Sequence, residues 1–399
     1  MALFDGLKVI ECATYIAGPS AASVLAEFGA DVVKIEAPGG DPYRARSIPP
    51  TSGYVHPRNP GFMLDGRSRR SIVLDLARAE GQAVLRRLIA QVDVFITNSP
   101  PDVRRKLGVT YEALGPENPR LIYAAFTGYG ERGPDRNRPG FDVTAWWARS
   151  GMMHLVRAAD AVPARSLGGM GDHPSGMALY AAIATALYQR ERTGRGMAVG
   201  SSLLANGLWA NASQVQARLL GEDVAVQPPR AQSRHPLRNH YRCADGKWLI
   251  LSIVPDQRRW EVFKRAVASP MLDDPLFATV ASRTEHALVL TEVLDVVFAA
   301  APRADWVAAL ERSGIVFGIV AEMEDIPDPQ MTESGALVPF ADDALLTVSA
   351  PFWVEGVEKV APTHAPEAGA DSEAVLREAG FAAGEIEALI AAGVVGARR

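Results

Sequence analysis

The chain has 399 residues, with 41 Lys or Arg against 46 Asp or Glu and a formal net charge of −5. This length exceeds one ordinary core, because domains usually span roughly 100–200 residues, so we expect two or three packed units. Charges of both signs are mixed along the chain, which argues against nucleic acid as a partner. Two cysteines are too few for a disulfide framework, and no run approaches the ~18–20 apolar residues of a membrane span. We therefore expect a soluble, cytoplasmic protein without membrane contact.

The first 130 residues alternate between short apolar runs and segments with helical spacing. Strand, helix and strand follow one another closely, which favours parallel strands joined by right-handed crossovers. The pattern therefore predicts an α/β domain with a parallel sheet. The expected strands are residues 7–12, 32–35, 71–76, 92–97 and 121–126, and the expected helices are residues 20–28 and 80–89.

The rest of the chain indicates a smaller mixed α/β domain, followed by a C-terminal segment that packs on the large domain. A long buried helix is expected over 176–192, and residues 210–236, with Pro228-Pro229, have the composition of a linker. A hairpin is expected over 241–253, and later helices over 260–266, 287–299, 304–311, 372–379 and 384–391. We divide the chain into a large domain (1–209), a linker (210–236), a small domain (237–325) and a return segment with closing helices (326–399).

The sequence lacks the motifs of several common classes of binding site and enzyme. The first strand-to-helix turn offers only Gly18 where a dinucleotide site needs G-x-G-x-x-G, and no phosphate-cradling G-x-x-x-x-G-K-[ST] loop is present. No H-E-x-x-H or paired C-x-x-C spacing supports a metal site, and no G-x-S-x-G supports a serine hydrolase. We expect neither a metal nor NAD.

One carboxylate stands out, because Asp172 lies between a glycine-rich loop, Gly168–Gly171, and the expected long helix. A helix cap explains it equally well, since Asp accepts hydrogen bonds from the free N–H groups of a first turn. Catalysis is compatible with that position, because the same N–H groups and the helix dipole favour an ionised carboxylate and can stabilise an oxyanion.

Short blocks with a specific order and spacing extend over nearly the whole chain. They are Ala17–Ala21, Phe28–Pro38, Arg69–Leu76, Asn118–Tyr123, Thr127–Gly130 with Gly133-Pro134, Gly171-Asp172, Arg192–Gly196, and Val375–Phe381 with Glu385-Ile386 and Leu389. Together these blocks resemble the class III CoA-transferase family, which includes formyl-CoA and carnitine CoA-transferases and the 2-methylacyl-CoA racemases.

The resemblance implies a Rossmann-like large domain built from both ends of the chain, a smaller inserted domain, and an interlocked homodimer. It implies that CoA moves from an acyl-CoA to a free carboxylic acid, with coenzyme A as substrate and product. Asp172 matches the family aspartate that forms first a mixed anhydride and then an aspartyl-CoA thioester. Such covalent intermediates split one difficult exchange into easier steps.

The resemblance also implies CoA contacts. Positions that match them, with Arg105 added as a phosphate partner beside Lys106, are Ile16, Ala17, Leu74, Asn98, Ser99, Arg105, Lys106, Pro139, Gly140, Phe141 and Asp142. Ala37 stands where the family often has a basic residue, so Arg44 or Arg67 would have to replace that phosphate contact. Ile16 stands where formyl-CoA transferase has a glutamine, which argues against oxalate as the acceptor.

Two other functions remain open at this point. The racemase branch needs a second proton-transfer group where this chain has Phe141, and phenylalanine carries no exchangeable proton. His154 and His173 are the histidines that could replace it. The other alternative is a non-catalytic CoA-binding protein, whose CoA binding would survive loss of Asp172.

Overall fold

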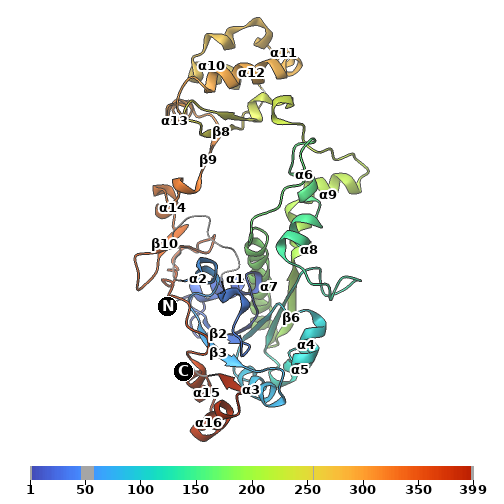
Figure 1. Cartoon of the computed structure of the whole chain (residues 1–399), viewed down its shortest axis with the longest axis vertical. Helices are drawn as coiled ribbons and strands as arrows, with labels where there is room; N and C mark the ends of the chain where they lie inside the picture. The colour runs from blue at the N-terminus through green and yellow to red at the C-terminus, as the bar shows by residue number, and fades with distance from the viewer. Residues whose placement is uncertain (1, 46–57, 255, 397–399) are drawn as a thin grey trace. The chain divides into compact units, whose positions relative to one another are not determined.

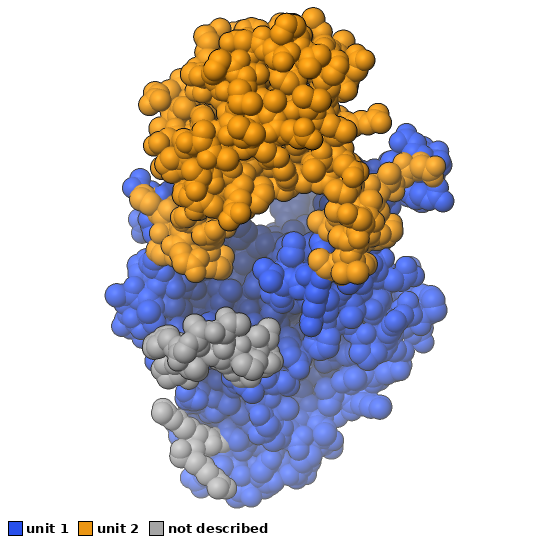
Figure 2. Space-filling view, turned by 45° about the horizontal axis from the view of Figure 1, so that its top comes forward, with its two compact units in different colours: residues 1–153, 165–222, 330–399 blue, residues 154–164, 223–329 orange. Residues whose placement is uncertain are grey.

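The computed structural model describes residues 2–45, 58–254 and 256–396. The chain forms two compact units, coloured separately in Figure 2. The first unit comprises residues 1–153, 165–222 and 330–399, and the second comprises residues 154–164 and 223–329. The first unit is thus built from both ends of the chain.

The first unit is organised around a seven-stranded sheet in the order β12-β3-β2-β1-β4-β5-β6. The strands are β1 (Lys8–Cys12), β2 (Asp31–Glu36), β3 (Arg70–Leu74), β4 (Val94–Thr97), β5 (Ile122–Thr127), β6 (Met197–Ser202) and β12 (Val395–Gly396). All neighbours pair in parallel except β12, which runs antiparallel to β3. The mostly parallel sheet expected from the sequence is confirmed. The order 3-2-1-4-5-6 of its parallel strands places a topological switch point between β1 and β4, where ligands of such sheets bind.

Helices cover both faces of this sheet (Figure 1). One face packs against α1 (Ala17–Glu27) and α7 (Asp172–Thr193), and the other against α3 (Ala79–Ile89), α15 (Ser372–Glu378) and α16 (Ala383–Ala391). Strand residues such as Val94 and Ile96 face α1 and α7, whereas Phe95 between them faces α3. This alternation follows from the two-residue period of a strand, and it explains why buried strands of this chain are apolar almost throughout.

The other helices of the first unit are short. They are α2 (Pro60–Asp65), α4 (Pro101–Leu107), α5 (Tyr111–Leu114), a π-helix (Asp142–Ala148), α8 (Leu203–Ala210) and α9 (Ala212–Leu219). Two further helices, α6 (Met152–Leu155) and α14 (Pro329–Glu333), span boundaries between the units. A two-stranded antiparallel sheet pairs β10 (Leu337–Pro339) with β11 (Leu346–Val348). Within the range 210–236, where a linker is expected, residues Ala212–Leu219 form α9. Ala, Gln, Arg and Leu favour a helix there even though α9 buries no residue.

The second unit contains a three-stranded antiparallel sheet and helices, whereas the sequence predicts only a hairpin and helices here. Strands β7 (His240–Arg242), β8 (Trp248–Leu251) and β9 (Phe317–Val320) pair antiparallel. Its helices are α10 (Gln257–Val267), α11 (Val280–Glu285), α12 (Ala287–Phe298) and α13 (Arg303–Arg312). Trp260, Phe263 and Phe298 are almost fully buried in its core.

Helices α1 and α7 approach each other closely at Gly176. A Cβ at this position would overlap the Ser20 hydroxyl and lie 2.8 Å from the Ala17 carbonyl oxygen. Gly176 is therefore required for the close contact that sets the N-terminal turn of α7 beside the start of α1.

We expect Gly176→Ala to destabilise the protein by about 1–3 kcal/mol, because the added methyl group must push the two helices apart. Urea denaturation measures the change. Gly384→Ala in α16 is the matched control, since nothing lies within 4 Å of its added Cβ. Equal effects of the two substitutions would contradict the close contact.

Candidate active site

A cavity of about 200 Å³ opens where β1, β4 and β5 end, at the switch point of the sheet. Loops that directly follow these strands supply one part of its wall, and the start of α7 supplies another. The residues that line it are Thr14, Tyr15, Ile16, Ala17, Asn98, Pro100, Phe126, Thr127, Gly128, Arg136, Arg138, Pro139, Gly140, Phe141, Asp172 and Leu203.

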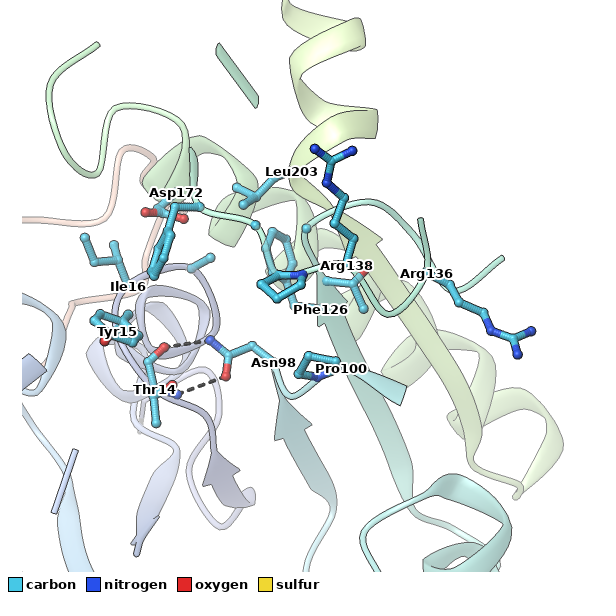
Figure 3. A pocket seen from close by; sticks show the side chains of 16 residues that line it. Thr14, Tyr15, Ile16, Asn98, Pro100, Phe126, Arg136, Arg138, Asp172 and Leu203 are labelled. Carbon is cyan, nitrogen blue, oxygen red and sulfur yellow. Dashed lines mark hydrogen bonds between the residues drawn. The ribbon is translucent and has the colours of Figure 1, made fainter. Parts of the chain in front are cut away.

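Asp172 is the first residue of α7, and its side chain lines the cavity (Figure 3). Gly171 occupies the N-cap position, and the helix has no side-chain cap. Helix capping, the alternative explanation for this aspartate, is therefore wrong. Within the described residues the Asp172 carboxylate forms no hydrogen bond or ion pair, and it faces the positive end of a 22-residue helix.

The loop before Asp172 is held by Asp142, the first residue of the π-helix. Its Oδ2 accepts a hydrogen bond from the Gly171 backbone N–H at 3.3 Å, and its Oδ1 accepts one from Val143 N–H at 2.7 Å. Gly171 also packs so closely on Trp146 that a Cβ would lie 2.6 Å from the indole ring. Asp142 is buried and supports the loop from behind, while Asp172 faces the cavity.

The environment of Asp172 disfavours its charged form. Desolvation raises its pKa first, the nearby Asp142 and Asp65 carboxylates raise it further, and the His173 imidazole lowers it, so that the pKa rises to about 7. A carboxyl group that titrates near neutral pH within a cavity is a recognised mark of a functional site.

The opposite wall is fixed by Asn98, which follows β4. Its amide accepts a hydrogen bond from Thr14 N–H at 3.0 Å and donates one to the Thr14 carbonyl oxygen at 2.6 Å, as Figure 3 shows. The next residue, Tyr15, has a positive φ of 62°, which is uncommon outside glycine. Its ring packs edge-on against Phe141, with centroids 5.5 Å apart.

The residues predicted to contact CoA divide into two groups. Ile16, Ala17, Asn98, Pro139, Gly140 and Phe141 line the cavity together with Asp172. The other five do not line the cavity. Leu74 is buried in the core beneath α3, Ser99 follows Asn98, and Asp142 supports the Gly171 loop. Arg105 pairs with Asp102, and Lys106 is exposed.

The two arginines considered as substitute phosphate partners are already engaged. Arg44 forms an ion pair with Glu36 at 2.6 Å, and Arg67 forms one with Glu27 at 3.0 Å. Arg136 and Arg138 line the cavity instead, and in the view of Figure 3 they lie on the side away from Asp172. Sequence analysis missed both, although the R-N-R-P-G spacing just before Phe141 was a usable signal.

In the part of the chain that the structure describes, no group of three or more His, Cys, Asp or Glu side chains could hold a metal ion. No described helix is both long enough and apolar enough to cross a bilayer.

Comparison with known proteins identifies the class. Residues 4–372 match the model of CoA-transferase family III. The chain therefore belongs to this family, and it is an enzyme of this class.

Relatives with assigned names agree with the family match. The chain is 28% identical to (R)-2-hydroxy-4-methylpentanoate CoA-transferase of Clostridioides difficile, over 95% of this chain and 96% of that protein. It is 29% identical to cinnamoyl-CoA:phenyllactate CoA-transferase of Clostridium sporogenes, over 97% and 96% of the two chains. Among solved structures, a CAIB/BAIF family protein from Brucella suis superposes with a TM-score of 0.83 at 28% identity, covering 95% of this chain and 99% of the other.

We expect Asp172→Asn to stabilise the protein above pH 7. The Asp172 pKa rises from 3.8 to about 7 on folding, so the native state binds more protons than the unfolded state between these values and loses stability as pH rises. One pKa unit corresponds to about 1.4 kcal/mol, so the gain at pH 8 is at most about 4 kcal/mol. It should disappear near pH 4. Denaturation at pH 4–9 measures it, with the exposed Asp5→Asn as control; an equally stable variant at pH 8 would contradict the raised pKa.

Proposed function

We propose that this enzyme transfers CoA from an acyl-CoA thioester to a free carboxylic acid, with Asp172 as the covalent nucleophile. The observation that carries the proposal is an unpaired carboxylate at the start of α7 that lines a cavity at the switch point of the sheet. A pKa of about 7 leaves a substantial fraction of Asp172 ionised at neutral pH while burial keeps it poorly solvated and reactive.

The first half of the reaction loads CoA onto the protein. An Asp172 carboxylate oxygen attacks the thioester carbonyl carbon, the C–S bond breaks, and the CoA thiolate leaves with the electron pair. The thiolate then attacks the Asp172 carboxyl carbon of the resulting anhydride, and the donor acid departs as a carboxylate. The product of this half is an aspartyl-CoA thioester.

The second half reverses these steps with the acceptor. A carboxylate oxygen of the acceptor acid attacks the aspartyl thioester carbonyl carbon and expels the CoA thiolate, which forms a new mixed anhydride. The thiolate attacks the acceptor carbonyl carbon, and the Asp172 carboxylate is released. No intermediate is hydrolysed in this sequence, so the energy of the thioester bond is retained in the product.

Other cavity residues have supporting parts in this proposal. The dipole of α7 favours negative charge that develops beside Asp172. Arg136 and Arg138 provide guanidinium groups for the phosphates of CoA. Phe141, at the place where a racemase would need an acid or base, offers an apolar wall and no proton-transfer group.

A homodimer, which the family resemblance implies, is part of this proposal. Trp209, Leu219 and Leu220 on and after helices α8 and α9 are 83%, 75% and 72% exposed in the single chain. Exposed apolar groups of this size often mark an interface. We expect light scattering after gel filtration to give twice the mass of one chain; a mass of 42.7 kDa would contradict the homodimer.

We expect Asp172→Ala to reduce acyl exchange by about a thousand-fold or more, because the covalent route is lost while CoA binding remains. Mass spectrometry should find CoA or an acyl group on Asp172, trapped with hydroxylamine, after incubation with acyl-CoAs. Suitable acceptors are the acids named for relatives, 2-hydroxy-4-methylpentanoate, phenyllactate and glutarate, with oxalate for comparison.

Asp5→Ala is the matched control, because Asp5 is exposed and lies outside the cavity. Exchange that survives in Asp172→Ala would overturn the covalent role of this residue. Rapid epimerisation of a 2-methylacyl-CoA without any acceptor acid would favour a racemase instead.

A further inference from the structure

His173, the residue after the proposed nucleophile, is held between two hydrogen-bond acceptors. Its Nδ1 lies 3.1 Å from the Gly169 carbonyl oxygen, and its Nε2 lies 3.0 Å from Asp65 Oδ1. A carbonyl oxygen can only accept, so Nδ1 carries a proton, and an ionised Asp65 likewise requires Nε2 to donate. The two contacts together select the doubly protonated, positively charged imidazole.

The buried position of Asp65 favours its pairing with the His173 imidazole. It is the last residue of α2 and is 2% exposed. Its second oxygen, Oδ2, is buried and has no hydrogen-bond partner among the residues that the structure describes. A buried carboxylate without an opposite charge is costly. The hydrogen bond and charge of Asp65 outweigh burial at His173 and raise the pKa of the imidazole.

The groups around this pair are mostly acidic or neutral. The Asp142 carboxylate, on the π-helix, raises the pKa of Asp172. Burial, together with the Asp65, Asp172 and Asp142 carboxylates, raises the pKa of Tyr43 to about 12. Tyr43 therefore stays neutral at ordinary pH.

Two further charged groups near the His173–Asp65 pair already have ion-pair partners. Asp41 also acts on Tyr43 but pairs with Lys34 at 2.8 Å. Arg67 lines a second cavity with Asp65 and His173 but pairs with Glu27. Arg67, the cation of the two, is therefore engaged by Glu27 and is not the counter-charge of Asp172.

We propose that His173 is a positioning residue for the reaction: paired with Asp65, it keeps a positive charge beside Asp172 and so maintains that carboxylate in its ionised, nucleophilic form at neutral pH. The inference rests on the proposed function, in which only the ionised Asp172 attacks. His173 itself exchanges no proton with the substrate in this role.

The test compares pH profiles of kcat/KM for the intact enzyme and two variants. His173→Gln removes the charge, and we expect the acidic limb to move by about one pH unit or more toward alkaline pH, as is usual when an opposite charge near a carboxylate is lost. Activity should return to within a few-fold of the original enzyme at high pH. His173→Lys keeps a cation that can pair with Asp65, and its acidic limb should stay close to the original.

A second readout does not depend on turnover. The Asp172 carboxyl carbon, labelled with ¹³C and assigned through Asp172→Asn, can be titrated by NMR, and His173→Gln should raise its midpoint. His364→Gln is the control, because His364 forms a similar pair with Asp343 at 3.2 Å but lies outside the cavity. An unchanged Asp172 midpoint, or activity lowered equally at every pH, would overturn the role of His173. Absence of CoA exchange by the intact enzyme would overturn the proposed function, while the titration would still decide the effect of His173.

Discussion

The contact between α1 and α7 at Gly176 is the constraint on which the rest of the candidate active site depends. Ala17 and Asp172 belong to different helices and are separated by more than 150 residues in the sequence, yet they line one cavity because Gly176 lets the helices touch. The sheet supplies the second condition, since β1 and β4 are neighbours from which successive connections leave in opposite directions. The loops after these strands therefore separate and leave room for a ligand.

Local strain and poor solvation are concentrated around this cavity. Tyr15 adopts a positive φ, Gly171 touches Trp146, and Asp172 lies near two other carboxylates. Each feature costs stability, and each brings a reactive or binding group into place, as is common at functional sites. The large apolar cores on both faces of the sheet offset these costs.

Much of the fold could be predicted from the sequence, because its signals are local. Apolar runs and helical spacing located β1 to β5, α3, α7 and α12 to within a few residues. Helix α9 was not predicted, because Pro228-Pro229 later in the same segment indicated a linker. The antiparallel pairing of β12 with β3 was not predicted either, because a strand of two residues carries no periodic signal.

Residues of the candidate site could be predicted where the residue type and its neighbours in the sequence are informative. They could not be predicted where the role of a side chain depends on its partner in the folded protein. Asp172 stands out by its glycine-rich setting before a helix, but a helix cap explains that setting equally well from sequence, and the expected role of Asp172 rests on the family resemblance. The arginines that line the cavity could not be predicted, because the arginines differ in their partners and not in their residue type: Arg44 is held by Glu36, whereas Arg136 lines the cavity. Ion pairs that form in the folded chain thus determine which charges remain available for a ligand. The same reasoning applies to the proposed nucleophile: His173 lowers the pKa of Asp172, and Asp65, more than 100 residues earlier in the chain, raises that pKa and pairs with His173.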